Sequence, residues 1–194
     1  MTRKTLIWTG IIAIAGFLVA ATEVRLQATK SSTISPYTAQ LSSPVRGLST
    51  QEIDDLLQGR GAGYARVAEL NRYPGPRHIL DLQQNLNLSP DQVTQIEGAF
   101  QQMQADAQQL GRKIVEREQQ LSTAFARGEI DSAELRLHTE ELSKLYSQVR
   151  ATHLQAHLQI KPLLQPEQIA AYNELRGYTT PAEQPSSVQP PHHQ

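Results

Sequence analysis

Two long runs of inward-facing positions, spaced alternately by three and four residues, constrain this chain more than any other feature. Such spacing places the apolar side chains on one face of an α-helix. The first run is Val93, Ile96, Phe100, Met103, Ala107, Leu110, Ile114, Leu121 and Phe125, and the second is Leu135, His138, Leu142, Leu145, Val149, Thr152, Ala156 and Ile160. Only a short turn, residues 127–131, separates the runs, which predicts an antiparallel helical hairpin. Aromatic residues make up only 5% of the chain, and the abundance of Ala, Leu and Gln favours helix, so we expect an all-α fold.

Capping residues define the ends of both long helices. Ser89 is a good N-cap and Pro90 suits the first helical position, so one continuous helix is expected over residues 90–127, roughly 57 Å long. Asp131 or Ser132 caps the second helix, and Pro162 ends or kinks it. A lone hairpin buries too little apolar surface to offset the backbone entropy lost on folding. We therefore expect short flanking helices and a homodimer of hooked hairpins.

Short helices are predicted on either side of the hairpin. Ser49 and Glu52 form a capping-box pattern that starts one helix, and the glycines of residues 59–63 end it. His78 lies in a second short helix, and a last helix ends at Gly177. The glycines of 59–63 resemble a phosphate-binding loop, but no strand precedes them and no Lys-Ser/Thr follows, so we interpret the segment as a flexible hinge.

Charge and cysteine content exclude several classes of function. The formal net charge is −1, from 18 Lys and Arg against 19 Asp and Glu, so nucleic-acid binding is not expected. The sequence has no cysteine, which excludes disulfides, zinc knuckles, iron–sulfur clusters and thiol catalysis. No nucleotide loop and no order of Ser, His and Asp typical of a catalytic triad is recognisable, so we predict that the protein is not an enzyme.

The first 21 residues have the pattern of an export signal. A positively charged start precedes the uncharged, mostly apolar residues 6–21, which leaves two alternatives: a signal peptide cleaved after Ala21, or a retained N-terminal membrane anchor. Either one places the body of the chain outside the cytoplasm. The sequence thus predicts four regions: the leader 1–21, a flexible tether 22–48, the helical hairpin domain 49–178 and a disordered, proline-rich tail 179–194.

One pentapeptide pattern occurs twice, at the start of the first long helix and before the last helix. Leu88-Ser-Pro-Asp-Gln92 and Leu164-Gln-Pro-Glu-Gln168 resemble the Leu-Thr-x-x-Gln motifs of the Spy/CpxP superfamily, and the resemblance extends over residues 47–178. Ser89 and Gln165 stand where that family has Thr, and Gln165 is a poor cap, so the second turn is expected to be looser. The resemblance implies an exported helical-hairpin stress protein, located in the periplasm or anchored to the inner membrane. It also includes a branch of heavy-metal sensor and resistance proteins.

His153 and His157 form the strongest candidate site. They are four residues apart on one helix face, at a separation that suits Zn²⁺, Ni²⁺ or Cu²⁺, and the resemblance adds Co²⁺. Folding the hairpin at its turn brings Glu97 near His157, where Gly98 lets the helices approach, and the helix with His78 folds over the same end. Glu97 and His78 would then complete a set of four metal ligands with the two histidines. The alternative is that both histidines are helix-flank residues hydrogen-bonded to carboxylates or water.

Two functions remain open from the sequence. The resemblance favours a periplasmic metal-responsive or metal-binding protein with a divalent transition metal as cofactor. It also allows an ATP-independent chaperone or stress-signalling module, whose partners are unfolded proteins or an envelope signalling protein. Arginines and lysines on the long helices suit such clients, although any solvated helix face shows the same mixture of charges.

Overall fold

The computed structural model describes residues 34–178, and every regular element in that range is a helix. Their order is η1 (Thr38–Ser42), α1 (Thr50–Gln58), α2 (Arg66–Glu69), α3 (Pro76–Asp81), α4 (Pro90–Arg127), α5 (Ser132–Ile160), η2 (Lys161–Leu163) and α6 (Pro166–Leu175). The helices α1 to α6 all belong to one compact unit, which begins at Ala39. The leader 1–21, part of the tether 22–48 and the tail 179–194 lie outside the described residues.

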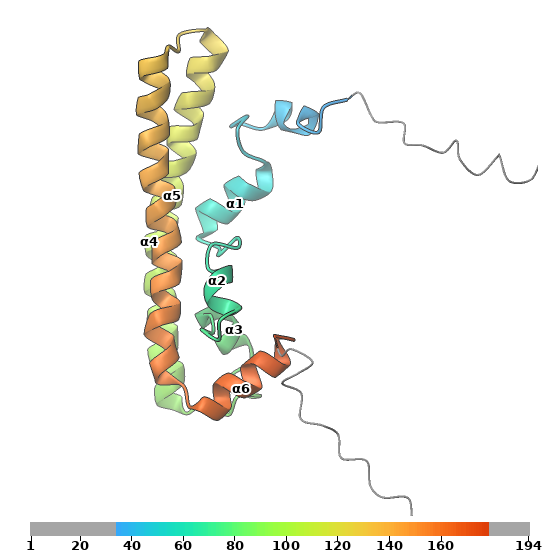
Figure 1. The fold of residues 1–194 in the computed structure, drawn as a ribbon, viewed down its shortest axis with the longest axis vertical. Helices are drawn as coiled ribbons and strands as arrows, with labels where there is room; N and C mark the ends of the chain where they lie inside the picture. Colours follow the sequence, from blue (N-terminus) through green and yellow to red (C-terminus); the bar gives the residue numbers. More distant parts are fainter. Residues whose placement is uncertain (1–33, 179–194) are drawn as a thin grey trace, which may run out of the picture. The chain divides into compact units, whose positions relative to one another are not determined.

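The predicted helical hairpin is confirmed. α4 and α5 pack antiparallel as two neighbouring rods (Figure 1). Ser89 Oγ accepts the N–H of Gln92 at the start of α4, and Asp131 Oδ1 accepts two backbone N–H groups at the start of α5. α4 ends at Gly128, whose φ of +67° is the left-handed conformation that glycine adopts most readily. The caps predicted from the sequence therefore define both helices.

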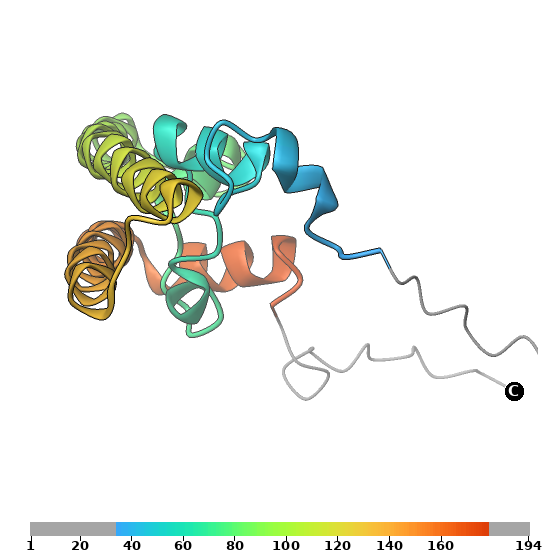
Figure 2. The same ribbon diagram turned by 90° about the horizontal axis from the view of Figure 1, so that it is seen from above.

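The short flanking helices are also confirmed, and they lie against the hairpin. α1, α2 and α3 follow one another along one side of it, and α6 lies across one end (Figure 1). α1 and α3 contact α4, whereas α2 and α3 contact α5 (Figure 2). We call the end of the hairpin at residues 89–100 and 153–164 the base, and the end at the turn 127–131 the tip.

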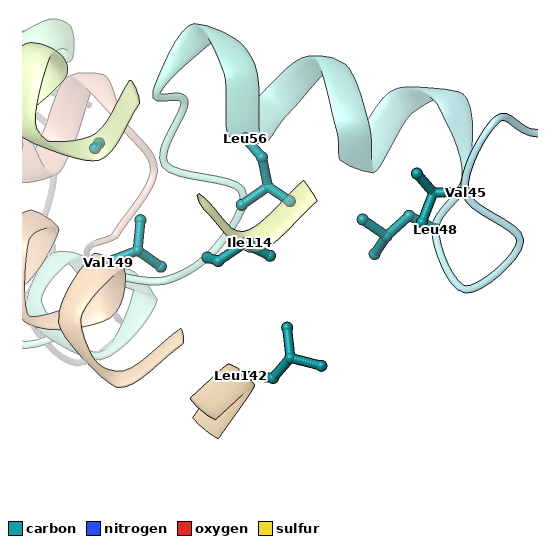
Figure 3. Packing of buried hydrophobic residues seen from close by; sticks show 7 residues of the cluster. Val45, Leu48, Leu56, Ile114, Leu142 and Val149 are labelled. Atoms are coloured by element: carbon teal, nitrogen blue, oxygen red, sulfur yellow. The ribbon is translucent and has the colours of Figure 1, made fainter. Parts of the chain in front are cut away.

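Two clusters of buried apolar side chains hold the helices together. The middle cluster joins the segment before α1 to α1, α4 and α5, and consists of Val45, Leu48, Leu56, Ala107, Ile114, Leu142 and Val149 (Figure 3). The base cluster joins α3, α4, α5 and α6, and its members include Ile79, Leu86, Ile96, Ile160, Leu164 and Tyr172. Val45 and Leu48, which the sequence places in the tether, are therefore part of the core.

The tip has no comparable cluster among the described residues. Phe125, an inward position of the first run, is 57% exposed, and Leu137 on α5 is 59% exposed. Leu135 is exposed as well. The expectation that Phe125 and Leu135 face the core is wrong, because the flanking helices that cover the seam pack against the middle and the base. Two helices alone leave part of their apolar stripes uncovered.

α1 ends directly against α4 at Gly111. A Cβ at Gly111 would lie 2.0 Å from the carbonyl oxygen of Leu56, so only glycine allows the two backbones to approach this closely. The prediction that Gly98 marks a close approach is wrong, since a Cβ there would meet nothing within 4 Å. The tight contact is made between α1 and α4, not between the two arms of the hairpin.

The last residues of the two pentapeptides, Gln92 and Gln168, bind each other at the base. Gln92 Nε2 donates to Gln168 Oε1 at 2.8 Å, and Gln168 Nε2 donates to Gln92 Oε1 at 3.1 Å. Each Oε1 also accepts the backbone N–H of the residue that precedes its own helix, Ser89 or Gln165, at 2.9 Å in both cases. We call this reciprocal pair the glutamine clasp.

The glutamine clasp also binds the backbone of the opposite turn. Gln92 Nε2 donates to the carbonyl of Leu163 at 2.8 Å, and Gln168 Nε2 donates to the carbonyl of Leu86 at 3.2 Å. Each side-chain amide therefore binds backbone groups near the starts of both α4 and α6. Such groups are costly to bury without hydrogen-bond partners. The repeated glutamine explains how the second turn is held although Gln165 is a poor cap.

Candidate functional site

A cavity of about 650 Å³ lies between the flanking segments and the hairpin. Its walls come from the loop after α1, from α2, from the start of α3 and from parts of α4 and α5. The potential metal ligands that line it include His78 from α3, Met103 from α4, and His153 and His157 from α5. Segments far apart in the sequence thus place three histidines around one hollow.

His157 is held in a single orientation by the backbone. Its side chain is 5% exposed, and Nδ1 lies 2.7 Å from the carbonyl oxygen of Tyr73. Because a carbonyl only accepts hydrogen bonds, Nδ1 carries a proton, and in the neutral ring Nε2 is the nitrogen with the free lone pair. Histidines that bind metals usually donate their second ring N–H in this way. Gly75 packs on the same ring, since a Cβ there would lie 2.9 Å from His157 Cε1.

His153 is buried next to His157 and is held by an aromatic ring. It is 3% exposed and stacks on Tyr64, with ring centroids 5.8 Å apart and planes 11° from parallel. Burial, with a smaller contribution from His157, lowers the pKa of His153 to about 4, so the ring is neutral at pH 7. Its Nε2 is buried without a hydrogen-bond partner in the described part of the chain. Both rings are therefore buried against tyrosine residues rather than placed on an exposed flank.

Glu97 does not join the histidines. It is exposed on α4 and is not among the residues that line the cavity. Its neighbour Ile96 faces the base cluster, and successive helix residues are about 100° apart, so Glu97 faces away. Within residues 34–178, no three His, Asp or Glu side chains are grouped closely enough to hold one metal ion. The cavity offers a pair of imidazoles on α5 rather than a complete set of protein ligands.

Burial also affects His78, the third histidine of the cavity. Its pKa is lowered first by desolvation and then by the positive charge of Arg176, while Glu69 acts in the opposite direction. The neutral form, which can donate a lone pair to a metal, is therefore favoured for His78 as well.

Comparison with known proteins adds no family assignment. No family model, curated protein or solved structure matches this chain. The structure establishes an all-helical protein with a long antiparallel helix pair. Of the helices between residues 34 and 178, none is long and apolar enough to cross a membrane.

Three residues around the histidine pair were not predicted from the sequence. Tyr64 stacks on His153, Tyr73 accepts from His157, and Glu69 lines the cavity close to His157. A Cβ on the intervening Gly75 would lie 2.6 Å from Glu69 Oε1 and 3.3 Å from His157 Nε2. The sequence offers one local signal for these contacts, the Pro-Gly-Pro turn that follows Tyr73. Its prolines fix the backbone, and Gly75, which has no Cβ, leaves space for the side chains of Glu69 and His157.

Proposed function

We propose that this chain is a non-enzymatic, exported envelope-stress protein of the Spy/CpxP-like kind that binds a divalent transition-metal ion through His153 and His157. The observation that supports this most is a pair of buried imidazoles, one helical turn apart, that line a single cavity. The twofold Leu-x-Pro-x-Gln pattern supports the assignment to the Spy/CpxP-like kind and hence the periplasm. We further propose that it acts as a homodimer, because the tip leaves apolar side chains exposed.

The chemistry of the pair suits a metal ion. Neutral imidazole binds Zn²⁺, Ni²⁺, Co²⁺ and Cu²⁺, and the lowered pKa of His153 means that its ring need not lose a proton at pH 7 to do so. A buried polar atom without a hydrogen-bond partner costs about 1–3 kcal/mol, and coordination would relieve this cost at His153 Nε2. Because Nδ1 of His157 is protonated and bound to the Tyr73 carbonyl, Nε2 is the atom of this ring that would coordinate the metal.

Calorimetric titration of the full chain with Zn²⁺, Ni²⁺ and Cu²⁺ tests the proposed site. The double variant His153→Ala, His157→Ala should weaken binding of the preferred ion by at least about 100-fold. His138→Ala is the matched control, since His138 lies on the same helix but lines a different hollow near Glu116 and Arg127. Equal affinities for the double variant and the wild type would refute metal binding at this pair.

A second candidate function is an ATP-independent chaperone or signalling module, and the exposed apolar side chains at the tip favour it. Phe125 and Leu137 offer apolar surface that an unfolded protein could cover. A variant with Phe125→Ser and Leu137→Ser should suppress aggregation of a denatured client less well than the wild type, with or without metal. Activity that depends on the histidines instead would favour the metal-binding function.

A further inference from the structure

The cavity is much larger than a metal ion. Its volume of about 650 Å³ equals roughly twenty water molecules at ~30 Å³ each, and falls in the range of pockets that take small organic molecules. A site built for a bare ion is usually closed by four protein ligands. Here no three His, Asp or Glu side chains within residues 34–178 are grouped for one ion. At least two coordination positions are thus left for donors from outside the protein.

The charged side chains of the cavity wall are mostly cationic. Arg60, Arg66 and Arg77 line it, against the single carboxylate of Glu69. Two of the three arginines have carboxylate partners: Arg60 pairs with Asp54 and Asp55, and Arg77 pairs with Asp81. Glu69 Oε2 accepts the hydroxyl hydrogen of Tyr172 at 2.7 Å.

Arg66 differs from the other two arginines. Among residues 34–178 no carboxylate lies within ion-pair distance of its guanidinium, which packs close to Gly63 on the loop after α1. A guanidinium is a planar, bidentate partner for carboxylates. Arg66 is therefore the guanidinium on this wall that can pair with a carboxylate of a ligand.

We infer that the cavity takes its metal as a complex with a small polycarboxylate chelator, in which His153 and His157 bind the metal and Arg66 binds a carboxylate of the chelator. The inference rests on the metal-binding function proposed above. The two imidazoles complete the coordination that the chelator leaves open. The remaining volume holds the chelator itself, and the arginine matches its negative charge.

Equilibrium dialysis of the full chain tests this with radiolabelled nickel and radiolabelled citrate as probes. Nickel–citrate, nickel alone and citrate alone are presented in separate arms. We expect nickel and citrate to be retained together in equal amounts from the first arm, and citrate alone not to be retained. Arg66→Gln should weaken citrate retention by about tenfold while nickel alone is still bound. Arg112→Gln, an exposed arginine of α4 outside the cavity, is the control and should behave as wild type.

The three arms separate this inference from the function on which it rests. Retention of nickel while citrate passes through freely would overturn the chelate inference and leave metal binding intact. The chelate inference would also be overturned if citrate were retained equally with and without nickel. The same holds if the His153→Ala, His157→Ala variant retained as much citrate as the wild type, because the cavity would then bind anions without a metal. Retention of nickel in no arm would refute the proposed function itself.

Discussion

The base and the tip of the hairpin share one helical pattern and differ in what covers it. At the base, Ile96 and Ile160 are fully buried because α3 and α6 pack over them. At the tip, Phe125 occupies an equivalent position of the same run and is exposed. The three-and-four spacing therefore decides that both ends are helical, but the flanking segments decide which end forms a core. The buried histidine pair and the cavity lie toward the covered end.

The sharpest way to test this contrast is to delete side chains at equivalent positions of the first run. Ile96→Ala removes buried apolar volume and should lower the free energy of unfolding by about 2–5 kcal/mol. Phe125→Ala removes an exposed ring and should change it by less than about 1 kcal/mol. Chemical denaturation with far-UV circular dichroism gives both values. Similar losses for the two variants would mean that the tip is covered as well as the base.

Two glycines of α4 provide a second comparison, in which one substitution should have opposite effects. Gly111→Ala places a Cβ against the Leu56 carbonyl and should cost about 3 kcal/mol, because backbone rather than a flexible side chain must move. Gly98→Ala meets no atom within 4 Å and should stabilise the helix by about 0.5–1 kcal/mol. Thermal unfolding of both variants measures the difference. Stabilisation by Gly111→Ala would show that α1 does not rest on α4.

The burial of His153 makes stability depend on pH. Its pKa is 6.5 in the unfolded chain and about 4 in the folded protein, so between these values only the unfolded state takes up the proton. The contribution of His153 to the free energy of unfolding is therefore present in full above pH 6.5. It is lost as the pH falls, so the free energy of unfolding decreases by about 3 kcal/mol between pH 6.5 and pH 4.

Denaturation curves at several pH values measure the effect. His153→Leu should flatten the dependence between pH 6.5 and 4, whereas His138→Leu should retain it. If His153→Leu and the wild type lose stability in parallel over this range, the ring of His153 is not buried as described.

The glutamine clasp offers the smallest of the predicted effects. Gln92→Ala leaves backbone groups at two helix starts without partners and should cost about 2 kcal/mol. The double variant with Gln168→Ala should lose less than the sum of the single variants, with a coupling of about 1 kcal/mol. Gln102→Ala, which breaks only an exposed contact to Asp106, should cost less than about 0.5 kcal/mol. Strict additivity in the double variant would argue against a reciprocal pair.

The sequence predicts those features that depend on local chemistry. The caps at Ser89 and Asp131 and the proline at position 162 fix the ends of α4 and α5, because their effects act within one helical turn. The pairing of His153 with His157 follows from helical spacing alone.

Features that depend on packing between distant segments could not be read from the sequence. Glu69 lies beside His157 because a turn near Gly75 passes over α5, and no periodicity marks that contact. Folding the hairpin at its turn predicts Glu97 in the site, but the position of Ile96 in the core turns Glu97 outward. Gly98 and Gly111 look alike in the sequence, and only the path of α1 distinguishes them.

Elemental analysis of the full chain purified from a cell envelope, without added metal, tests the proposed histidine site most directly. We predict about one transition-metal ion per chain for the wild type and for His138→Ala, and almost none for the variant with His153→Ala and His157→Ala. Metal-free wild-type protein, or equal metal content in the wild type and the double variant, would contradict the proposed site.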